Sequence, residues 1–342
     1  MRAFGFEQHG GPEVLEHFEV DRPEPGPGEV RVKTEAVALN HLDIWVREGW
    51  PGLDLELPHV LGTDTAGVVA ETGPNVQGLD RGDPVVVNPA LWCGFCRACE
   101  RGEQSLCENF TILGEHVRGS LCEEVVVPAR NVLVRPGRLE THEAAAVPLV
   151  FQTAWRMANR GDIRPDNIVF VPGAGGGVAT ASIQIAKHLG AQVIASTSSE
   201  EKAAKAEKIG ADDVVDYTED DWGEQVYDLT QGEGVDVVLD SVGEEVWAEA
   251  QRFLTDGGDL VCCGATSGPQ AQLDLRYVFY NQLSFVGSTM ASASEFDEIM
   301  SLVFNGWMEP IVDSTFSFEE ANKAFEYLED GRQFGKVVVE TA

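Results

Sequence analysis

Four cysteines stand close together between residues 93 and 107, with the spacing C-x2-C-x2-C-x7-C. Zn²⁺ prefers tetrahedral coordination by thiolates, and a site closed by four cysteines leaves no position for water or substrate. The spacing therefore predicts one structural zinc ion per chain that holds a loop in shape and performs no Lewis-acid chemistry. An iron–sulfur cluster is disfavoured, because Glu108 stands where the bacterial cluster motif has a proline. The predicted ligands are Cys93, Cys96, Cys99 and Cys107.

A glycine-rich stretch follows an apolar strand pattern near residue 170 and precedes a helical pattern. Small residues let a backbone approach a pyrophosphate, and the N-terminus of the following helix offers unpaired N–H groups. The stretch 174–179 fits the pattern G/A-x-G-x-x-G/A in this strand–helix context, which predicts binding of a dinucleotide. The predicted contacts are Ala174, Gly175, Gly176, Gly177 and Val178.

The end of the next strand indicates which dinucleotide binds. NAD enzymes usually carry Asp or Glu there, whereas this strand ends at Thr197 and Ser198 without a carboxylate. Lys202 could pair with a 2′-phosphate, and Tyr217 could close over the same pocket. A solvated helix lysine is the alternative interpretation of Lys202. Together these residues favour NADP(H) over NAD(H).

The elements that must position these residues fall into two kinds. Up to about residue 135 the pattern is rich in β-branched runs separated by Gly, Pro and Asp turns. After about residue 140, six short apolar strands alternate with helical patterns, which predicts a doubly wound parallel sheet. We therefore expect an α/β protein in which a Rossmann-type domain interrupts a β-barrel-like domain. The six strand patterns are NIVFVPG, QVIAST, DVVDY, VDVVLDS, DLVCCGA and LSFVGSTM.

Composition excludes several classes of partner. The net charge is −33, and the acidic residues are spread along the whole sequence. Such a field repels nucleic acid and anionic lipid, and no apolar run reaches the length of a membrane span. Seven cysteines and a start without a signal-peptide core favour a cytoplasmic protein. With nucleic acid and membranes excluded, we expect a small-molecule substrate. The uniformly acidic, Lys-poor surface is similar to that of halophilic proteins.

Five stretches together resemble the medium-chain dehydrogenase/reductase superfamily, which includes zinc-type alcohol dehydrogenases and quinone oxidoreductases. The resemblance implies a GroES-like β-barrel domain of residues 1–151 and 293–342, with a zinc lobe at about 91–109, and a Rossmann domain of residues 152–292. It implies that substrate and nicotinamide meet in the cleft between these domains. Thr153, Val242 and Gly264 join the expected cofactor site. The stretches are GEVRVKTEAVALNHLD, LGTDTAGVV, the four-cysteine lobe, PGAGGGVATASIQIAKHLGA and GKVVVE.

The resemblance also indicates that a catalytic zinc site is lost. Zinc alcohol dehydrogenases have a cysteine ligand at the position of Asn40 and a histidine ligand at the position of Thr63. A third ligand is not evident here, and only Asp43 of the neighbouring motif is kept. His41 and Asp64 remain candidates for residual metal binding, although ordinary structural or cofactor contacts explain them better.

The pattern looks like the quinone oxidoreductase branch. It implies an NADP(H)-dependent enzyme that transfers hydride to a quinone, enone or related carbonyl without a catalytic zinc. We expect Asn40 and Thr63 to donate hydrogen bonds to the carbonyl oxygen, with His41 as a weaker candidate proton source. The alternatives are an alcohol or aldehyde dehydrogenase with an altered metal site and a non-catalytic NADPH-binding sensor. The apolar strand in NQLSFVGSTM favours a homodimer or homotetramer.

The acidic composition predicts that salt stabilises the protein. Salt screens repulsion between exposed like charges, so we expect Tm and activity to rise as NaCl increases from about 0.1 M, where the Debye length is about 10 Å. Thermal unfolding and turnover measured across a titration up to molar salt would test this. A melting temperature that does not change with salt would contradict it.

Overall fold

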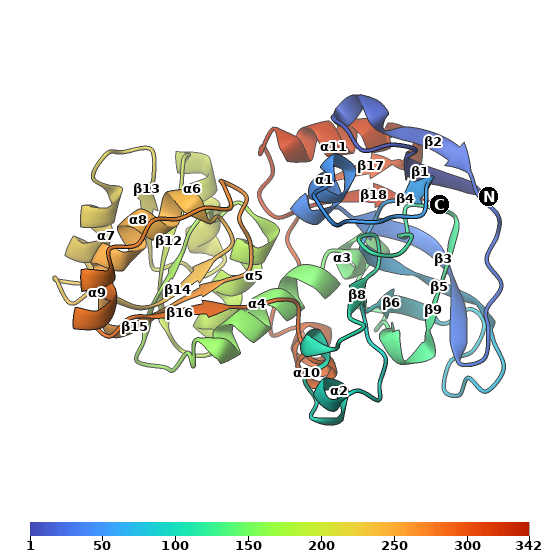
Figure 1. Cartoon of the computed structure of the whole chain (residues 1–342), viewed down its shortest axis with the longest axis horizontal. Coiled ribbons are helices and arrows are strands. Elements are labelled where there is room, and N and C mark those ends of the chain that lie inside the picture. Colours follow the sequence, from blue (N-terminus) through green and yellow to red (C-terminus); the bar gives the residue numbers. More distant parts are fainter. Residues whose placement is uncertain (342) are drawn as a thin grey trace. The chain divides into compact units, whose positions relative to one another are not determined.

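The computed structural model describes residues 1–341 and divides into two compact units. One unit is formed by Met1–Leu149 together with Ser292–Ala342, and the other by Val150–Ala291. The first unit therefore takes its residues from both ends of the sequence, and the second is one continuous insertion (Figure 1).

The first unit is built mainly from β-strands. Its largest sheet has the order β10-β6-β5-β3-β18-β17, and β9 pairs with β3. Smaller sheets have the orders β2-β1-β4 and β7-β8. The strands are β1 (Arg2–Phe6), β2 (Glu16–Glu19), β3 (Glu29–Ala38), β4 (His59–Val60), β5 (Asp64–Thr72), β6 (Pro84–Val87), β7 (Ala90–Leu91), β8 (Thr111–Ile112), β9 (Glu124–Pro128), β10 (Val132–Val134), β17 (Val312–Ser317) and β18 (Lys336–Glu340).

Alternation of side chains along β3 connects two apolar cores of this unit. Val30 and Val32 pack in one cluster with valines of β5, β6 and β9. Val37 and Leu39 pack in another cluster with β18 and with the helix α11 (Ala321–Glu329). Because successive side chains of a strand point to opposite faces, one long strand can serve both cores. β3 is thus the central scaffold of the unit.

Within residues 1–341, five α-helices belong wholly to the first unit, and a further α-helix, α4, leads into the second. The sequence predicts one continuous helix over 142–161, but the structure ends α3 at Ala145 and starts α4 at Pro148. Proline lacks the N–H that a helix interior needs, so it begins a new helix instead. The five are α1 (His41–Glu48), α2 (Arg97–Glu100), α3 (Thr141–Ala145), α10 (Ala293–Phe304) and α11 (Ala321–Glu329), and α4 spans Pro148–Arg160.

The second unit contains the predicted six-stranded parallel sheet. Its order is β13-β12-β11-β14-β15-β16, the arrangement of a Rossmann fold, in which ligands bind at the carboxyl ends of the strands. The elements are β11 (Ile168–Val171), α5 (Gly177–His188), β12 (Gln192–Thr197), α6 (Glu200–Lys208), β13 (Asp213–Asp216), α7 (Trp222–Leu229), β14 (Val235–Asp240), α8 (Glu244–Phe253), β15 (Leu254–Cys262), α9 (Leu275–Tyr280) and β16 (Ser284–Gly287).

Two segments differ from the sequence prediction. The sequence EEVWAEAQRFLTDGG predicts a helix through Gly258, but α8 ends at Phe253, because Leu254 pairs with Val235 and packs into the core of the sheet. Tertiary pairing outweighs local helix propensity at this point. In the other segment, β17 was not predicted at all, since VDSTFS is largely polar, yet it pairs in parallel with β18.

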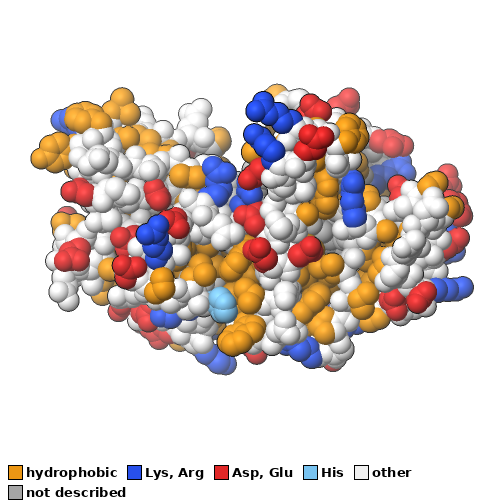
Figure 2. Space-filling model, turned by 90° about the horizontal axis from the view of Figure 1, so that it is seen from below, with side chains coloured by type: hydrophobic (Ala, Val, Ile, Leu, Met, Phe, Trp, Pro, Cys, Tyr) orange, Lys and Arg blue, Asp and Glu red, His pale blue; other side chains and the backbone are white. Residues whose placement is uncertain are grey.

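The acidic residues are dispersed over the surface. Figure 2 shows Asp and Glu side chains distributed across the visible face of the molecule instead of gathered in one patch. Among the helices of residues 1–341, none combines the length and the apolar character needed to cross a membrane.

Candidate functional site

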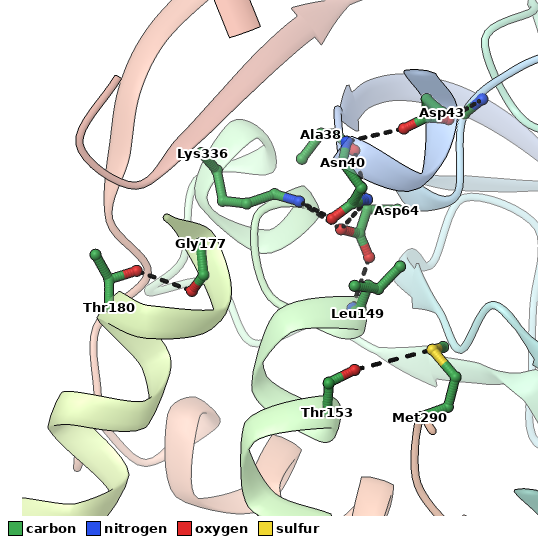
Figure 3. Close-up of polar contacts among 11 residues, drawn as sticks. Ala38, Asn40, Asp43, Asp64, Leu149, Thr153, Gly177, Thr180, Met290 and Lys336 are labelled. Carbon is green, nitrogen blue, oxygen red and sulfur yellow. Dashed lines mark hydrogen bonds and ion pairs between the residues drawn. The ribbon is translucent and has the colours of Figure 1, made fainter. Parts of the chain in front are cut away.

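A buried carboxylate, Asp64, lies at the start of β5 and has no exposed surface. Its Oδ1 accepts a hydrogen bond from the backbone N–H of Leu149 at 2.7 Å. Its Oδ2 accepts from the Asn40 amide and forms an ion pair with Lys336 Nζ, both at 3.0 Å. Lys336, whose side chain is 4% exposed, was missed by the sequence analysis. Both carboxylate oxygens therefore have partners, and the charge is balanced inside the unit (Figure 3).

Strand register explains why these distant residues meet. Ala38 at the end of β3 pairs with Asp64 on β5 and with Val338 on β18. Asn40 lies two residues after Ala38, and Lys336 lies two residues before Val338 on the antiparallel strand. The three polar side chains consequently gather at one end of three neighbouring strands.

The amide of Asn40 is fully engaged by this network. Its Nδ2 donates to Asp64 at 3.0 Å and to the carbonyl of Ala38 at 3.3 Å, while its Oδ1 accepts from Lys336 at 2.5 Å. An asparagine amide has only two N–H donors. The arrangement therefore argues against the predicted role of Asn40 as a donor to substrate, because that role would require one of these bonds to break.

A second buried carboxylate, Asp43, supports the same loop from α1. It accepts from the backbone N–H of Asn40 at 2.8 Å and from that of Gly62 at 2.9 Å. Burial raises the pKa of Asp43 to about 6, against the opposing effects of these two N–H groups and of the Lys336 ammonium. Asp43 thus positions the backbone around Asn40 and the turn that leads into Asp64.

His41 and Thr63 lie outside this hydrogen-bond network within residues 1–341. His41 begins α1, and its ring packs edge-on against Trp45 with 5.0 Å between ring centroids. Burial lowers the pKa of His41, which favours a neutral ring. Thr63 is buried, and its hydroxyl has no hydrogen-bond partner among the described residues. Of the predicted catalytic residues, the structure therefore joins Asn40, Asp43 and Asp64 but neither of these two.

The four clustered cysteines converge on one point of the first unit. Their sulfur atoms all lie within 4.8 Å of one another, and three of the separations are 3.5, 3.5 and 3.9 Å. Four sulfurs placed 2.3 Å from a tetrahedral zinc ion would stand about 3.8 Å apart. The cluster therefore fits a closed metal site.

Backbone groups around the cluster favour thiolates over thiols. The N–H groups of Cys93 and Asn109 donate to the sulfur of Cys107 at 3.4 and 3.3 Å. The N–H groups of Cys99 and Glu108 lower the pKa of the Cys96 thiol to about 6. Metal ligation requires the deprotonated form, which these N–H groups favour at Cys96, whereas burial raises the pKa of the Cys99 thiol to about 12.

The glycine-rich turn connects β11 to α5 in the second unit. Gly173 has φ +67°, a conformation that side chains other than glycine rarely adopt. The N–H of Ala174 donates to the carbonyl of Ser196 at 2.8 Å, which ties the turn to the end of β12. Gly176 caps α5, and a Cβ on Gly176 would lie 3.4 Å from the carbonyl oxygen of Gly173. The turn thus brings three consecutive glycines, Gly175 to Gly177, to the N-terminus of a twelve-residue helix, where their backbone can approach a pyrophosphate closely.

The residues predicted to select the nucleotide lie together at the ends of β12 and β13. The Tyr217 N–H donates to the carbonyl of Thr197 at 3.1 Å, and the Tyr217 side chain is partly exposed. Lys202 stands in the first turn of α6, where its N–H donates to the Ser199 hydroxyl. Ser198 lies between Thr197 and this helix.

Asp240, a residue that the sequence analysis missed, shapes the ends of β14 and β15. Its carboxylate accepts from the N–H groups of Val242 at 2.8 Å and Gly243 at 3.1 Å, and from Trp247 Nε1 at 2.8 Å. Burial raises its pKa. A Cβ on Gly264 would lie 2.7 Å from the carbonyl oxygen of Ser241, so the two strand ends approach closely. Asp240 therefore fixes the turn that holds Val242.

Thr153, also assigned to the cofactor site, lies on α4 and is buried. Its hydroxyl is 3.9 Å from the sulfur of Met290. Figure 3 shows this contact within the second unit, together with the bond from Thr180 to the carbonyl of Gly177 in the first turn of α5.

Comparison with known proteins gives consistent matches over the whole chain. Residues 26–137 match the alcohol dehydrogenase GroES-like domain, and residues 177–305 match the zinc-binding dehydrogenase domain. The chain is 34% identical to an NAD-dependent alcohol dehydrogenase of Sulfurisphaera tokodaii, over 99% of both sequences. It is 31% identical to an acryloyl-coenzyme A reductase of Metallosphaera sedula, over 94% of this chain and 95% of that one. A crystal structure of an NAD-dependent alcohol dehydrogenase matches with a TM-score of 0.97 and 46% identity, covering all of both chains.

Replacing Asp43 with asparagine should change how stability depends on pH. A carboxyl whose pKa is raised by folding contributes its full stability when the pH is below the pKa of the unfolded state, near 3.8. That contribution is lost as the pH rises through the pKa of the folded state, about 6. The stability advantage of the wild type over Asp43→Asn should therefore shrink by on the order of 3 kcal/mol between pH 4 and pH 7. Urea unfolding of both proteins across this range measures it. A difference that stays constant with pH would refute the assignment.

Proposed function

Because the chain belongs to the zinc-type alcohol dehydrogenase family of the medium-chain dehydrogenase/reductase superfamily, we propose that it is an NADP(H)-dependent oxidoreductase acting without a catalytic metal. Its substrate is a conjugated carbonyl compound, namely an enone, a related thioester or a quinone. The reaction is transfer of hydride to this substrate.

The observation that carries the proposal is the set of groups at the expected metal position. The family resemblance puts two zinc ligands at Asn40 and Thr63, and an amide and a hydroxyl are poor ligands for zinc. Asp64 is the remaining carboxylate there, and its oxygens are already bound by Lys336, Asn40 and Leu149. A metal cation at this position would face the positive charge of the Lys336 ammonium, and both oxygens of Asp64 would already be occupied.

The second unit fits a bound dinucleotide. The glycine turn and the N-terminus of α5 suit a pyrophosphate, and the ends of β14 and β15 approach closely at Ser241 and Gly264. At the end of β12, Thr197 offers a hydroxyl, and Lys202 follows in the next helical turn. This donor set suits a ribose 2′-phosphate better than a bare 2′-hydroxyl, which supports NADP(H).

Conjugate reduction needs less electrostatic support than alcohol oxidation. A bound reduced nicotinamide supplies the hydride. The chain's part is to orient the substrate and to stabilise the charge that develops on its carbonyl oxygen through fixed N–H or O–H donors. Alcohol oxidation would instead require an alkoxide to be stabilised before hydride leaves, which is the usual task of a catalytic zinc. The similarity to an acryloyl-coenzyme A reductase favours an activated alkene as substrate.

The four-cysteine site then holds one structural zinc ion. Its ligands Cys93, Cys96, Cys99 and Cys107 leave no open coordination position, so the metal holds the loop and takes no part in the reaction. None of the seven cysteines, all of which lie within residues 1–341, forms a disulfide, which favours a reducing compartment such as the cytoplasm.

Two other functions are distinguished by metal content and turnover. The names of several relatives favour an NAD-dependent alcohol dehydrogenase, which would need a second zinc or another means of stabilising an alkoxide. An NADPH-binding sensor would bind the cofactor without turnover.

Purified protein should contain about one zinc per chain and should oxidise NADPH faster than NADH in the presence of an enone or quinone. Metal analysis and initial rates over a panel of enones, enoyl thioesters, quinones and primary alcohols test both points. Two zinc ions per chain with alcohol turnover would refute the proposal in favour of the alcohol dehydrogenase. Cofactor binding with no turnover on the whole panel would instead favour the sensor.

We also propose that the enzyme is at least a homodimer that pairs through β16. This strand is the edge of the parallel sheet, and its outer N–H and C=O groups are available for pairing. Exposed apolar side chains lie on the adjacent α9, with Phe279 70% and Tyr280 81% exposed. Asp274 and Arg276 are the only charged residues between 260 and 292, and they pair with each other. A chain with a net charge of −33 can approach its copy most easily through such a neutral surface.

Replacing Phe279 and Tyr280 together with glutamate should shift the protein toward monomers, because each copy then brings two new negative charges to the shared surface. Sedimentation velocity in buffers of matched salt measures the mass. Trp307→Glu, at a residue 68% exposed in the first unit, is the matched control and should leave the mass unchanged. A monomeric wild type, or a double variant with wild-type mass, would rule out this interface.

A further inference from the structure

We propose that the Lys336 ammonium is the catalytic residue that stabilises the negative charge on the substrate's carbonyl oxygen, at the position where the family resemblance puts a catalytic zinc. The inference rests on the proposed function and names the group that replaces the metal. It is carried by the contacts of Lys336 with Asn40 and Asp64 and by the donors that each of these groups has left.

In this cluster Lys336 is the side chain that still has an N–H group available to donate to a substrate. A lysine ammonium has three N–H donors and no acceptor. Two of them are used by Asn40 Oδ1 and Asp64 Oδ2. Within residues 1–341 the third has no acceptor, whereas both amide hydrogens of Asn40 are occupied. The donor role predicted for Asn40 from the sequence is therefore assigned to Lys336.

The surrounding contacts fix the position of the ammonium. Asp64 is itself held by the backbone N–H of Leu149, and Asn40 is held by its bonds to Asp64 and Ala38. Lys336 therefore has two immobilised acceptors, although lysine side chains are otherwise flexible. A donor that is fixed before reaction needs no reorganisation when charge develops in the transition state.

The burial of this ion pair also needs an explanation beyond stability. Lys336 is 4% exposed and Asp64 is fully buried, and desolvation of such a pair commonly offsets most of the attraction between its members. Replacing a buried ion pair with apolar residues of similar size is often neutral or stabilising. A role in stabilising substrate charge accounts for a buried cation at this place.

The proposed step balances without a proton leaving the lysine. The β-carbon of the activated alkene receives the hydride, a new C–H bond forms, and the C=C electron pair moves to the carbonyl oxygen as an enolate. The third N–H of Lys336 donates a hydrogen bond to this oxygen and remains an ammonium. The α-carbon then takes a proton from water, which completes a two-electron reduction of the substrate and leaves the nicotinamide oxidised.

The experiment compares the wild type with Lys336→Met, Lys336→Arg and the double variant Lys336→Met/Asp64→Asn. The double variant removes both charges, so that no unpaired carboxylate remains buried if the single variant fails to fold. Lys323→Met, at an exposed lysine of α11, is the matched control. Each protein is assayed with NADPH and a series of enones whose enolates differ in basicity, together with thermal unfolding and zinc content.

We expect kcat to fall by about 10²–10³-fold in the folded methionine variants, with partial recovery in Lys336→Arg and no change in Lys323→Met. The KM for NADPH and the zinc content should stay at wild-type values. The dependence of kcat on enolate basicity should steepen, and the isotope effect with NADPH deuterated at C4 should rise. A purely structural role would lower Tm without changing that dependence.

The outcomes separate this inference from the proposed function. If the wild type reduces enones and a folded methionine variant keeps kcat within about threefold, the inference is overturned and the proposed function stands. If the wild type reduces no member of the panel, both are overturned.

Discussion

A buried carboxylate must find partners for both of its oxygens, and in this protein that requirement organises one end of the first unit. Asp64 obtains them from a backbone N–H, an amide and an ammonium. The partners come from Leu149, Asn40 and Lys336, three segments that are distant in sequence, so the pairing works only when β5, β3 and β18 have their observed register. An error of one residue in this register would turn Lys336 to the other face and leave the carboxylate unpaired.

The features that could be predicted from sequence are those whose signal is local. Six apolar strands with helical crossovers, the glycine turn and the closely spaced cysteines are each contained in one short stretch, and the six-stranded parallel sheet is as predicted. The position of Lys336 beside Asp64 could not be found in this way, because KVVVE indicates only a strand. Its partner Asp64 is 272 residues away, and sheet register between such distant strands has no local signature.

The cysteine cluster and the Asp64 cluster are assembled in different ways. The cysteine cluster is made within one loop, where closely spaced thiolates and backbone N–H groups suffice to form a cage. The Asp64 cluster is assembled by the sheet, and it contains a fixed ammonium and no sulfur. The strongest local motif of the sequence and the cluster proposed to act on the substrate are therefore separate sets of residues.

The first unit is interrupted by the second, and this has a consequence for synthesis. Asp64 leaves the ribosome 272 residues before Lys336, which at ordinary elongation rates is a delay of roughly 14–54 s. During that interval the continuous second unit, Val150–Ala291, can fold on its own, while β3 and β5 lack the strand that neutralises their buried acid. The nascent sheet therefore remains open on the β18 side of β3 until the whole second unit has been synthesised.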